Sequence, residues 1–139
     1  MNTVIIYNSK RGKTKAYAEE IASYLQTKGN HNVKTFSIED VDNETIDSAN
    51  LILIGSWTSG LYFFAQGPDK KWKQFAQSLP ELSNKTVGLF TTYKLLTGSM
   101  FKNMNKHLET KLKAPVELFL KSKKSSLTEE NKITLNHIV

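Results

Sequence analysis

The stretch VIIYNSKRGKT, residues 4–14, is the segment from which the fold can be read. Four apolar residues end abruptly at a polar turn that contains Gly12, and an amphipathic pattern begins directly after Thr14. This order predicts a buried strand that leads through a turn into a helix. The first turn of a helix offers unpaired backbone N–H groups and the positive end of the helix dipole. We therefore expect residues 8–14 to bind an anion.

The side chains of this turn suit a phosphate group. Ser9 and Thr14 supply hydroxyl groups, which can donate hydrogen bonds to phosphate oxygens. Positive charge comes from three neighbouring residues, Lys10, Arg11 and Lys13. Backbone, hydroxyl and cationic donors therefore occur together in one short turn.

The same turn partly matches a nucleoside-triphosphate loop. Gly12-Lys13-Thr14 agrees with the end of the pattern G-x-x-x-x-G-K-[ST]. However, Tyr7 stands where that pattern requires its first glycine. The strand that ends at Ile54 is followed by Gly55-Ser56, with no acidic residue to bind magnesium. These two departures argue against an ATPase or GTPase.

Beyond this segment, apolar strand-like runs alternate with amphipathic helical patterns. Strands are expected at residues 2–7, 32–38, 51–54, 86–90 and 115–120. Helices are expected from Thr14 to the stop signal Gly29-Asn30, at 44–48, from Pro68-Asp69 to Pro80, after a cap at Ser99, and after the capping-box pattern Ser126-Leu127-Thr128-Glu129. The alternation predicts an α/β fold: a doubly wound five-stranded parallel sheet with helices on both faces, in one domain over residues 1–139.

The composition excludes several kinds of chemistry. The chain has no cysteine, so disulfides, thiolate metal sites and cysteine nucleophiles are absent. Its three histidines lack metal-ligand spacing. No apolar run approaches the ~20 residues that a membrane span needs, and the first residues do not form a signal peptide. We therefore expect a cytoplasmic protein without a membrane partner.

The net charge of +6 is compatible with an anionic partner. The lysines are scattered along the chain, however, and the two densest clusters lack the interleaved aromatics of a base-stacking surface. Nucleic acid is therefore not the expected partner.

Two further polar loops follow the third and fourth expected strands. One runs from Gly55 to Gly60 and contains Trp57, and the other runs from Thr91 to Gly98 and contains Tyr93. In doubly wound sheets, ligands bind beyond the carboxyl ends of the strands. We therefore expect these two loops to lie beside the phosphate-binding turn.

The spacing Ser9-x-x-Gly12-x-Thr14, its place after the first strand and the two later loops resemble the flavodoxin-like family. The resemblance covers essentially the whole chain, which looks like a short-chain flavodoxin. It implies FMN as the cofactor, with its phosphate in the first turn and its ring between the two later loops. The implied cofactor-binding residues are Ser9, Lys10, Arg11, Gly12, Lys13, Thr14, Ser56, Trp57, Thr58, Ser59, Gly60, Thr91, Thr92, Tyr93 and Gly98, with no catalytic residue and no metal ligand.

Some roles stay open at this stage. Trp57 is the candidate stacking residue, but an aromatic in a long loop can also belong to the core or the surface. Tyr93 is the candidate second aromatic, or it packs on the fourth helix. The run Tyr62-Phe63-Phe64 is compatible with a lid, a docking patch or a satellite core.

The resemblance implies an electron carrier that exchanges electrons with a redox partner protein through the exposed flavin edge. This chain is basic, whereas familiar flavodoxins are acidic, so we expect an acidic docking face on the partner. Lys94 beside the ring is expected to favour anionic reduced flavin. Two alternatives remain: a small FMN-dependent NAD(P)H or quinone reductase, and a non-redox anion-binding regulatory domain.

Overall fold

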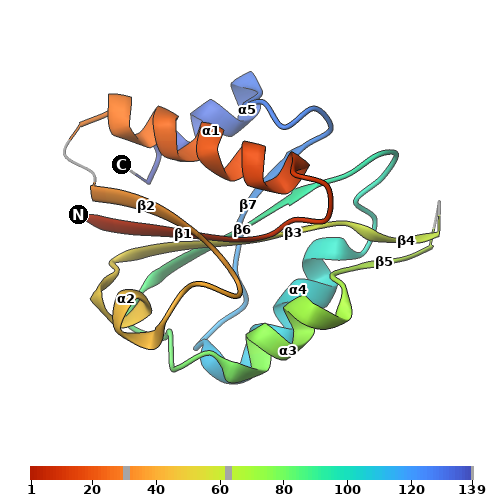
Figure 1. The fold of residues 1–139 in the computed structure, drawn as a ribbon, viewed down its shortest axis with the longest axis horizontal. Helices are drawn as coiled ribbons and strands as arrows, with labels where there is room; N and C mark the ends of the chain where they lie inside the picture. The colour runs from red at the N-terminus through yellow and green to blue at the C-terminus, as the bar shows by residue number, and fades with distance from the viewer. Residues whose placement is uncertain (30–31, 62–63, 139) are drawn as a thin grey trace.

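A five-stranded parallel sheet forms the middle layer of the molecule, and helices cover both of its faces (Figure 1). The computed structural model describes residues 1–29, 32–61 and 64–138. The strands of this sheet are β1 (Asn2–Asn8), β2 (Asn32–Ser37), β3 (Leu51–Trp57), β6 (Thr86–Thr92) and β7 (Leu118–Ser122). The helices are α1 (Lys13–Thr27), α2 (Asn43–Ser48), α3 (Lys70–Ser78), α4 (Met100–Leu108), the 3₁₀ turn η1 (Glu109–Lys111) and α5 (Glu129–Asn136).

The strand order is β2-β1-β3-β6-β7, and every neighbouring pair is parallel. The chain leaves β1 toward β2 on one side and continues through β3 on the other. This reversal creates a switch point at the carboxyl ends of β1 and β3, where doubly wound sheets bind ligands. The doubly wound fold expected from the alternation of elements is confirmed.

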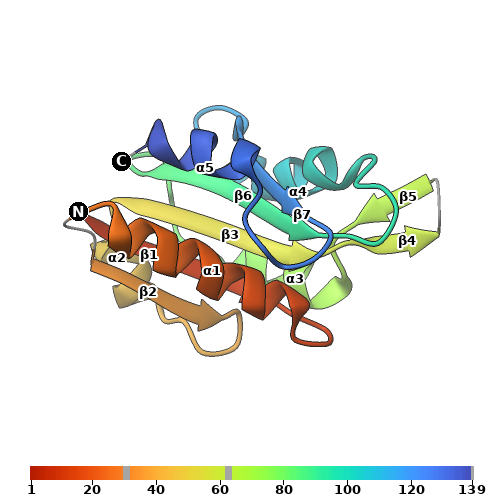
Figure 2. The same ribbon diagram turned by 90° about the horizontal axis from the view of Figure 1, so that it is seen from above.

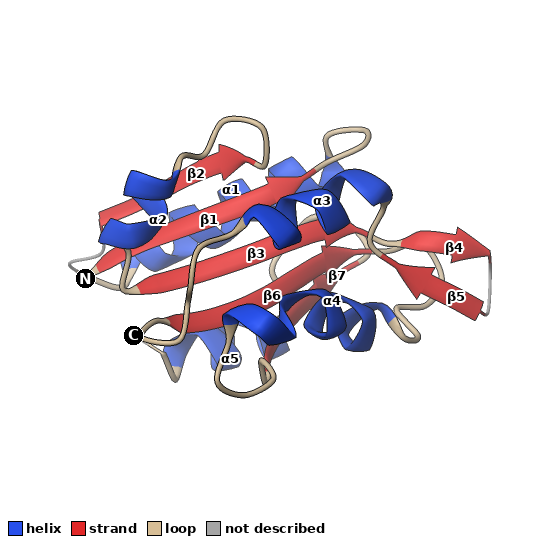
Figure 3. Cartoon of the chain, turned by 90° about the horizontal axis from the view of Figure 1, so that it is seen from below, coloured by secondary structure: helices blue, strands red, loops and turns tan. Residues whose placement is uncertain are grey.

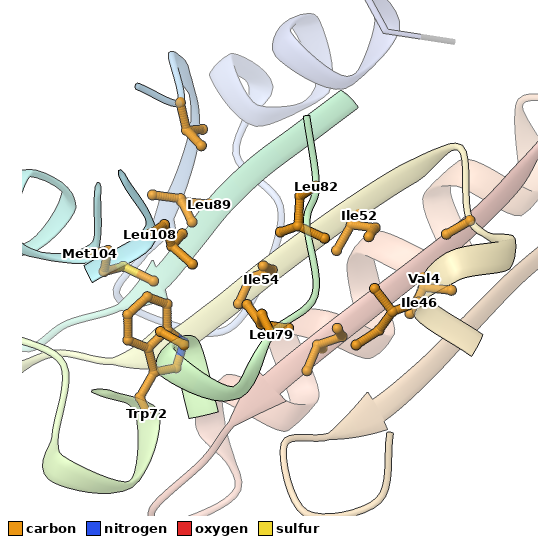
Figure 4. Close-up of a cluster of buried hydrophobic side chains, with 14 of the residues drawn as sticks. Val4, Ile46, Ile52, Ile54, Trp72, Leu79, Leu82, Leu89, Met104 and Leu108 are labelled. Carbon is orange, nitrogen blue, oxygen red and sulfur yellow. The ribbon is translucent and has the colours of Figure 1, made fainter. Parts of the chain in front are cut away.

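Each face of the sheet has its own apolar core. One lies under α1 and α5 and includes Ile5, Tyr17 and Phe90 (Figure 2). The other lies under α3 and α4 and includes Ile6 and Trp72 (Figures 3 and 4). Successive strand residues point to opposite faces, so the continuous apolar run of β1 supplies both cores.

Two strands extend further than the sequence pattern predicts. β3 continues to Trp57 and β6 to Thr92, and Ser56 pairs with Thr91 at this polar end. Pairing with a neighbouring strand outweighs the polar character of these residues. Consequently, Ser56, Trp57, Thr91 and Thr92, which were expected in loops, lie within strands of the sheet.

The last strand begins later than expected, at Leu118 rather than Pro115. Proline lacks an N–H group for the strand ladder. The Asn105 side chain binds both backbone groups of Val116. Asn105 Oδ1 accepts from Val116 N at 2.8 Å, and Asn105 Nδ2 donates to Val116 O at 3.1 Å. The segment before the strand is therefore held by a side chain instead of a neighbouring strand.

One expected helix cap is wrong, and a second lacks its side-chain bond. The capping box of α5 is formed by Thr128 and Asn131, not by Ser126 and Glu129. Thr128 Oγ1 accepts from Asn131 N at 3.0 Å, so the helix begins two residues later than the S-x-x-E pattern indicates. Ser99 is the N-cap residue of α4, as expected, but its side chain makes no cap bond, and its hydroxyl donates to the carbonyl of Gln66 at 2.9 Å.

The expected long connection from Trp57 to Pro68 contains an antiparallel hairpin of β4 (Ser59–Leu61) and β5 (Phe64–Gly67). The hairpin extends beyond the carboxyl ends of the main-sheet strands (Figures 1 and 2). The expectation for the aromatic run falls on Tyr62 and Phe63, which lie outside the described residues. In the described part of the chain, no helix is long and apolar enough to span a membrane.

Candidate functional site

A cavity of about 680 Å³ opens at the carboxyl ends of β1, β3 and β6, within the size range of small-molecule sites. Its lining residues are Lys10, Arg11, Lys13, Thr14, Trp57, Thr58, Ser59, Gln66, Thr92, Tyr93, Lys94, Leu95 and Leu96. All three expected loops therefore contribute to a single site.

The turn between β1 and α1 presents backbone donors to this cavity. Gly12 has a φ of 88°, and the first helical hydrogen bond runs from Ala16 N to Gly12 O at 2.9 Å. The first N–H groups of α1 lack intrahelical acceptors, and no side chain of the N-cap residue bonds to them. Ser9 Oγ accepts from Gly12 N at 3.0 Å, which leaves the hydroxyl proton of Ser9 available for an anion.

Thr14 is buried and joins this turn to β6. Its hydroxyl oxygen lies 2.7 Å from that of Thr92, and either group can be the donor. When Thr92 donates, the Thr14 proton is free for a phosphate oxygen. The two hydroxyls therefore connect the start of α1 to the end of β6.

Trp57 lines the cavity as a half-buried aromatic and does not belong to either core. Lys10 Nζ lies 4.7 Å from the centroid of its ring. The indole N–H donates to Asp69 Oδ2 at 3.2 Å. The ring is thus in contact with a cation over its face and a carboxylate at its edge.

Tyr93 is the second aromatic residue that lines the cavity. Its backbone N–H donates to Ser122 O at 3.3 Å, which attaches the loop after β6 to the end of β7. Lys121 and Lys123 lie 6.0 and 5.8 Å from the ring centroid, measured from Nζ. Lys94, the next residue, is exposed at the rim of the cavity.

Some expected site residues support the cavity without lining it. Ser56 is fully buried, and its hydroxyl accepts from Asn8 Nδ2 at 3.3 Å and donates to the Trp57 carbonyl at 3.2 Å. Thr91 is also fully buried and donates to the Ser56 carbonyl at 2.7 Å. The structure therefore places these two hydroxyls in the framework beneath the site.

The expected glycines have different roles. Gly12 has open space around it in the turn between β1 and α1, where an added Cβ would meet nothing within 4 Å. Gly98 has a φ of 48°, and a Cβ there would lie 2.5 Å from Gln66 Oε1. Gly98 therefore allows the loop to pack against the hairpin, and it does not line the cavity. Gly60 belongs to β4.

Sequence reasoning missed three lining residues: Gln66, Leu95 and Leu96. Gln66 lies on β5, and its carbonyl accepts from Asn103 Nδ2 at 2.7 Å. The hairpin that brings Gln66 to the site has no recognisable turn motif. The available signal in the sequence was the apolar pair Leu95-Leu96 within an otherwise polar loop, and the structure leaves these leucines 52% and 44% exposed.

The charge around the cavity is positive. Lys10, Arg11, Lys13 and Lys94 line it, and no acidic residue is among the described lining residues. Backbone donors, hydroxyls and cations at one end suit a phosphate, and two aromatics suit a planar ring. Within the described residues, no group of three or more His, Asp or Glu side chains is placed to hold a metal ion.

The fold and the site define a protein of the flavodoxin type. The family described as "Flavodoxin domain" matches residues 4–138, and the chain belongs to this family. A flavodoxin from Clostridium saccharobutylicum is 30% identical over 98 residues, which cover 70% of this chain and 59% of that relative. The match thus spans less than two thirds of the length of this curated relative.

Solved structures of flavodoxins have the same architecture. The two-electron reduced flavodoxin of Megasphaera elsdenii is 26% identical, with a TM-score of 0.77 over 95% of this chain and 94% of that chain. Flavodoxin 2 of Bacillus cereus, at 21% identity, shares the fold with a TM-score of 0.73 over 99% and 94% of the two chains. Flavodoxin homologues bind FMN, and the donor set of this cavity fits that cofactor.

Proposed function

We propose that this chain binds FMN in the cavity and transfers electrons between redox partner proteins. The observation that carries the proposal is the meeting of three strand ends: a phosphate-type turn after β1, Trp57 at the end of β3, and Tyr93 after β6. FMN, when bound, supplies one- or two-electron chemistry. The protein supplies binding, orientation and electrostatics.

The chain's own groups divide this work. The N–H groups at the start of α1, the hydroxyls of Ser9 and Thr14, and the neighbouring cations would hold the phosphate. Trp57 and Tyr93 would flank the ring and exclude water from its faces. Thr58 N donates to Thr92 O at 3.0 Å, which holds the segment after β3 against β6.

An absorption spectrum and an FMN titration test this function. We expect the purified protein to show the visible absorption of oxidised flavin, or to quench the fluorescence of one equivalent of added FMN. NADPH alone is expected to leave the bound flavin oxidised, because the proposed carrier receives electrons from a partner. A colourless protein that leaves FMN fluorescence unchanged would refute the proposal, and bleaching by NADPH alone would favour a reductase.

The lysines near Tyr93 support a partner with an acidic docking face. Lys94, Lys121 and Lys123 surround the site where electrons would leave. A positive rim attracts a negative partner and raises the association rate at low salt. Anionic ferricyanide and cationic hexaammineruthenium(III) are small acceptors that probe this field without a known partner.

Neutralising the rim is expected to slow oxidation of the reduced protein by ferricyanide. For the variant Lys94→Gln/Lys121→Gln/Lys123→Gln, we expect about a tenfold lower rate at low salt and little change at high salt. Oxidation by hexaammineruthenium(III) is expected to become faster. The matched control is Lys28→Gln/Lys34→Gln/Lys113→Gln, which removes equal charge outside the cavity. Equal effects of the two triple variants would exclude a local docking field.

A further inference from the structure

The Asp69 carboxylate connects three elements beside the cavity. Its Oδ1 accepts from Asn8 Nδ2 at the end of β1 at 2.7 Å, and from Trp72 N in the first turn of α3 at 3.0 Å. Its Oδ2 accepts from Trp57 Nε1 at the end of β3 at 3.2 Å. One side chain therefore caps α3, fixes the end of β1 and holds the edge of Trp57.

Asp69 is not among the residues that line the cavity. Its route to a ligand is through Trp57, whose ring does line it. The Asp69 bond fixes the indole edge, and Lys10 lies 4.7 Å from the ring centroid. Two contacts of different kinds therefore hold the ring in one orientation.

We propose that Asp69 is a positioning residue, which holds Trp57 for stacking on FMN and thereby sets the relative affinity for oxidised and reduced FMN. This inference rests on the proposed function. A carboxylate that accepts the indole N–H increases the electron density of the ring. An electron-rich ring and a nearby negative charge both disfavour the electron-rich reduced cofactor. Loss of the Asp69–Trp57 bond therefore shifts the preference toward reduced FMN.

The variant Asp69→Asn is expected to remove the bond to the Trp57 indole and to keep the cap of α3. An asparagine retains one carbonyl oxygen, which can still accept from Asn8 and from Trp72 N. Its NH₂ group cannot accept the indole N–H of Trp57. The matched control is Asp42→Asn, because Asp42 caps α2 by accepting from Thr45 N at 2.8 Å and does not line the cavity.

The first readout needs no cofactor. The chain has two tryptophans, so Trp57→Phe assigns the two indole N–H signals in an NMR spectrum. In Asp69→Asn, we expect hydrogen exchange at the Trp57 indole to become about tenfold faster. The buried Trp72 indole serves as the internal reference, and Asp42→Asn is expected to change neither signal. An unchanged exchange rate at Trp57 would overturn the positioning role.

The second readout is the ratio of the dissociation constants for oxidised and reduced FMN. Asp69→Asn is expected to shift this ratio about fivefold toward reduced FMN. In a Trp57→Phe background, the same substitution is expected to shift the ratio only about twofold, because the indole donor is gone and only the loss of the nearby negative charge remains. Equal shifts in both backgrounds would overturn the inference. Failure of the wild-type protein to bind FMN would refute the proposed function and the effect of Asp69 on FMN affinity. The exchange experiment would still decide whether Asp69 positions Trp57.

Discussion

Replacing Gly12 by valine is expected to weaken FMN binding about a hundredfold and to leave the affinity for riboflavin within about twofold of wild type. Gly12 has a φ of 88°, a conformation that a β-branched residue strongly disfavours. Relaxation to a negative φ would turn the flanking peptide groups away from the phosphate. Losing one or two charge-assisted hydrogen bonds of about 1.5–3 kcal/mol each accounts for this magnitude.

Riboflavin lacks the phosphate, so it separates damage to the turn from damage to the ring site. The matched control is Gly29→Val, since Gly29 also has a positive φ, of 131°, and open space around it. It lies outside the cavity lining. Fluorescence titrations of both flavins against both variants provide the measurement. An equal loss of FMN and riboflavin affinity in Gly12→Val would show that the turn does not hold the phosphate.

Replacing Trp72 by alanine is expected to lower the free energy of unfolding by about 3–5 kcal/mol. Trp72 is fully buried in the core beneath α3 and α4, near Met104 (Figure 4). Removal of its ring leaves a cavity that the surrounding side chains fill only partly. Urea denaturation measures the loss. Ile133→Ala is the control, because Ile133 is 58% exposed and its truncation is expected to change stability by less than about 1 kcal/mol.

A second substitution tests the polar atom of this tryptophan. The buried Nε1 of Trp72 has no hydrogen-bond partner within the described structure. Removing an unpaired buried donor offsets part of the lost packing. Trp72→Phe is therefore expected to reduce stability by less than half as much as Trp72→Ala. Similar losses for the two variants would show that the indole N–H is satisfied in solution.

The layered fold was predictable because buried elements have recognisable patterns of neighbouring apolar residues. A parallel strand covered on both faces needs apolar residues at consecutive positions, as in Leu51 to Ile54. The turn after β1 was equally local, because a strand, Gly12 and a helix start follow each other directly. The resemblance then related the loops around Trp57 and Tyr93 to the same site.

The features that were missed depend on contacts between distant parts of the chain. Ser56 and Thr91 read as loop residues, yet pairing between β3 and β6 keeps them in strands. Gln66 reaches the cavity on a hairpin, and the Gln66 carbonyl accepts a hydrogen bond from Asn103 of α4. Asp69 was recognised only as part of a helix start, because its bonds to β1 and β3 span 61 and 12 residues.

Amide NMR signals of the labelled protein, followed during addition of FMN, test the location of the cofactor directly. We expect the largest changes at residues 10–14, 57–59 and 92–96, with the signals around Lys113 and Val116 at the separate second cavity unchanged. That pattern would place FMN at the three strand ends. No change on adding FMN, or changes centred on another part of the fold, would contradict the proposed flavin site.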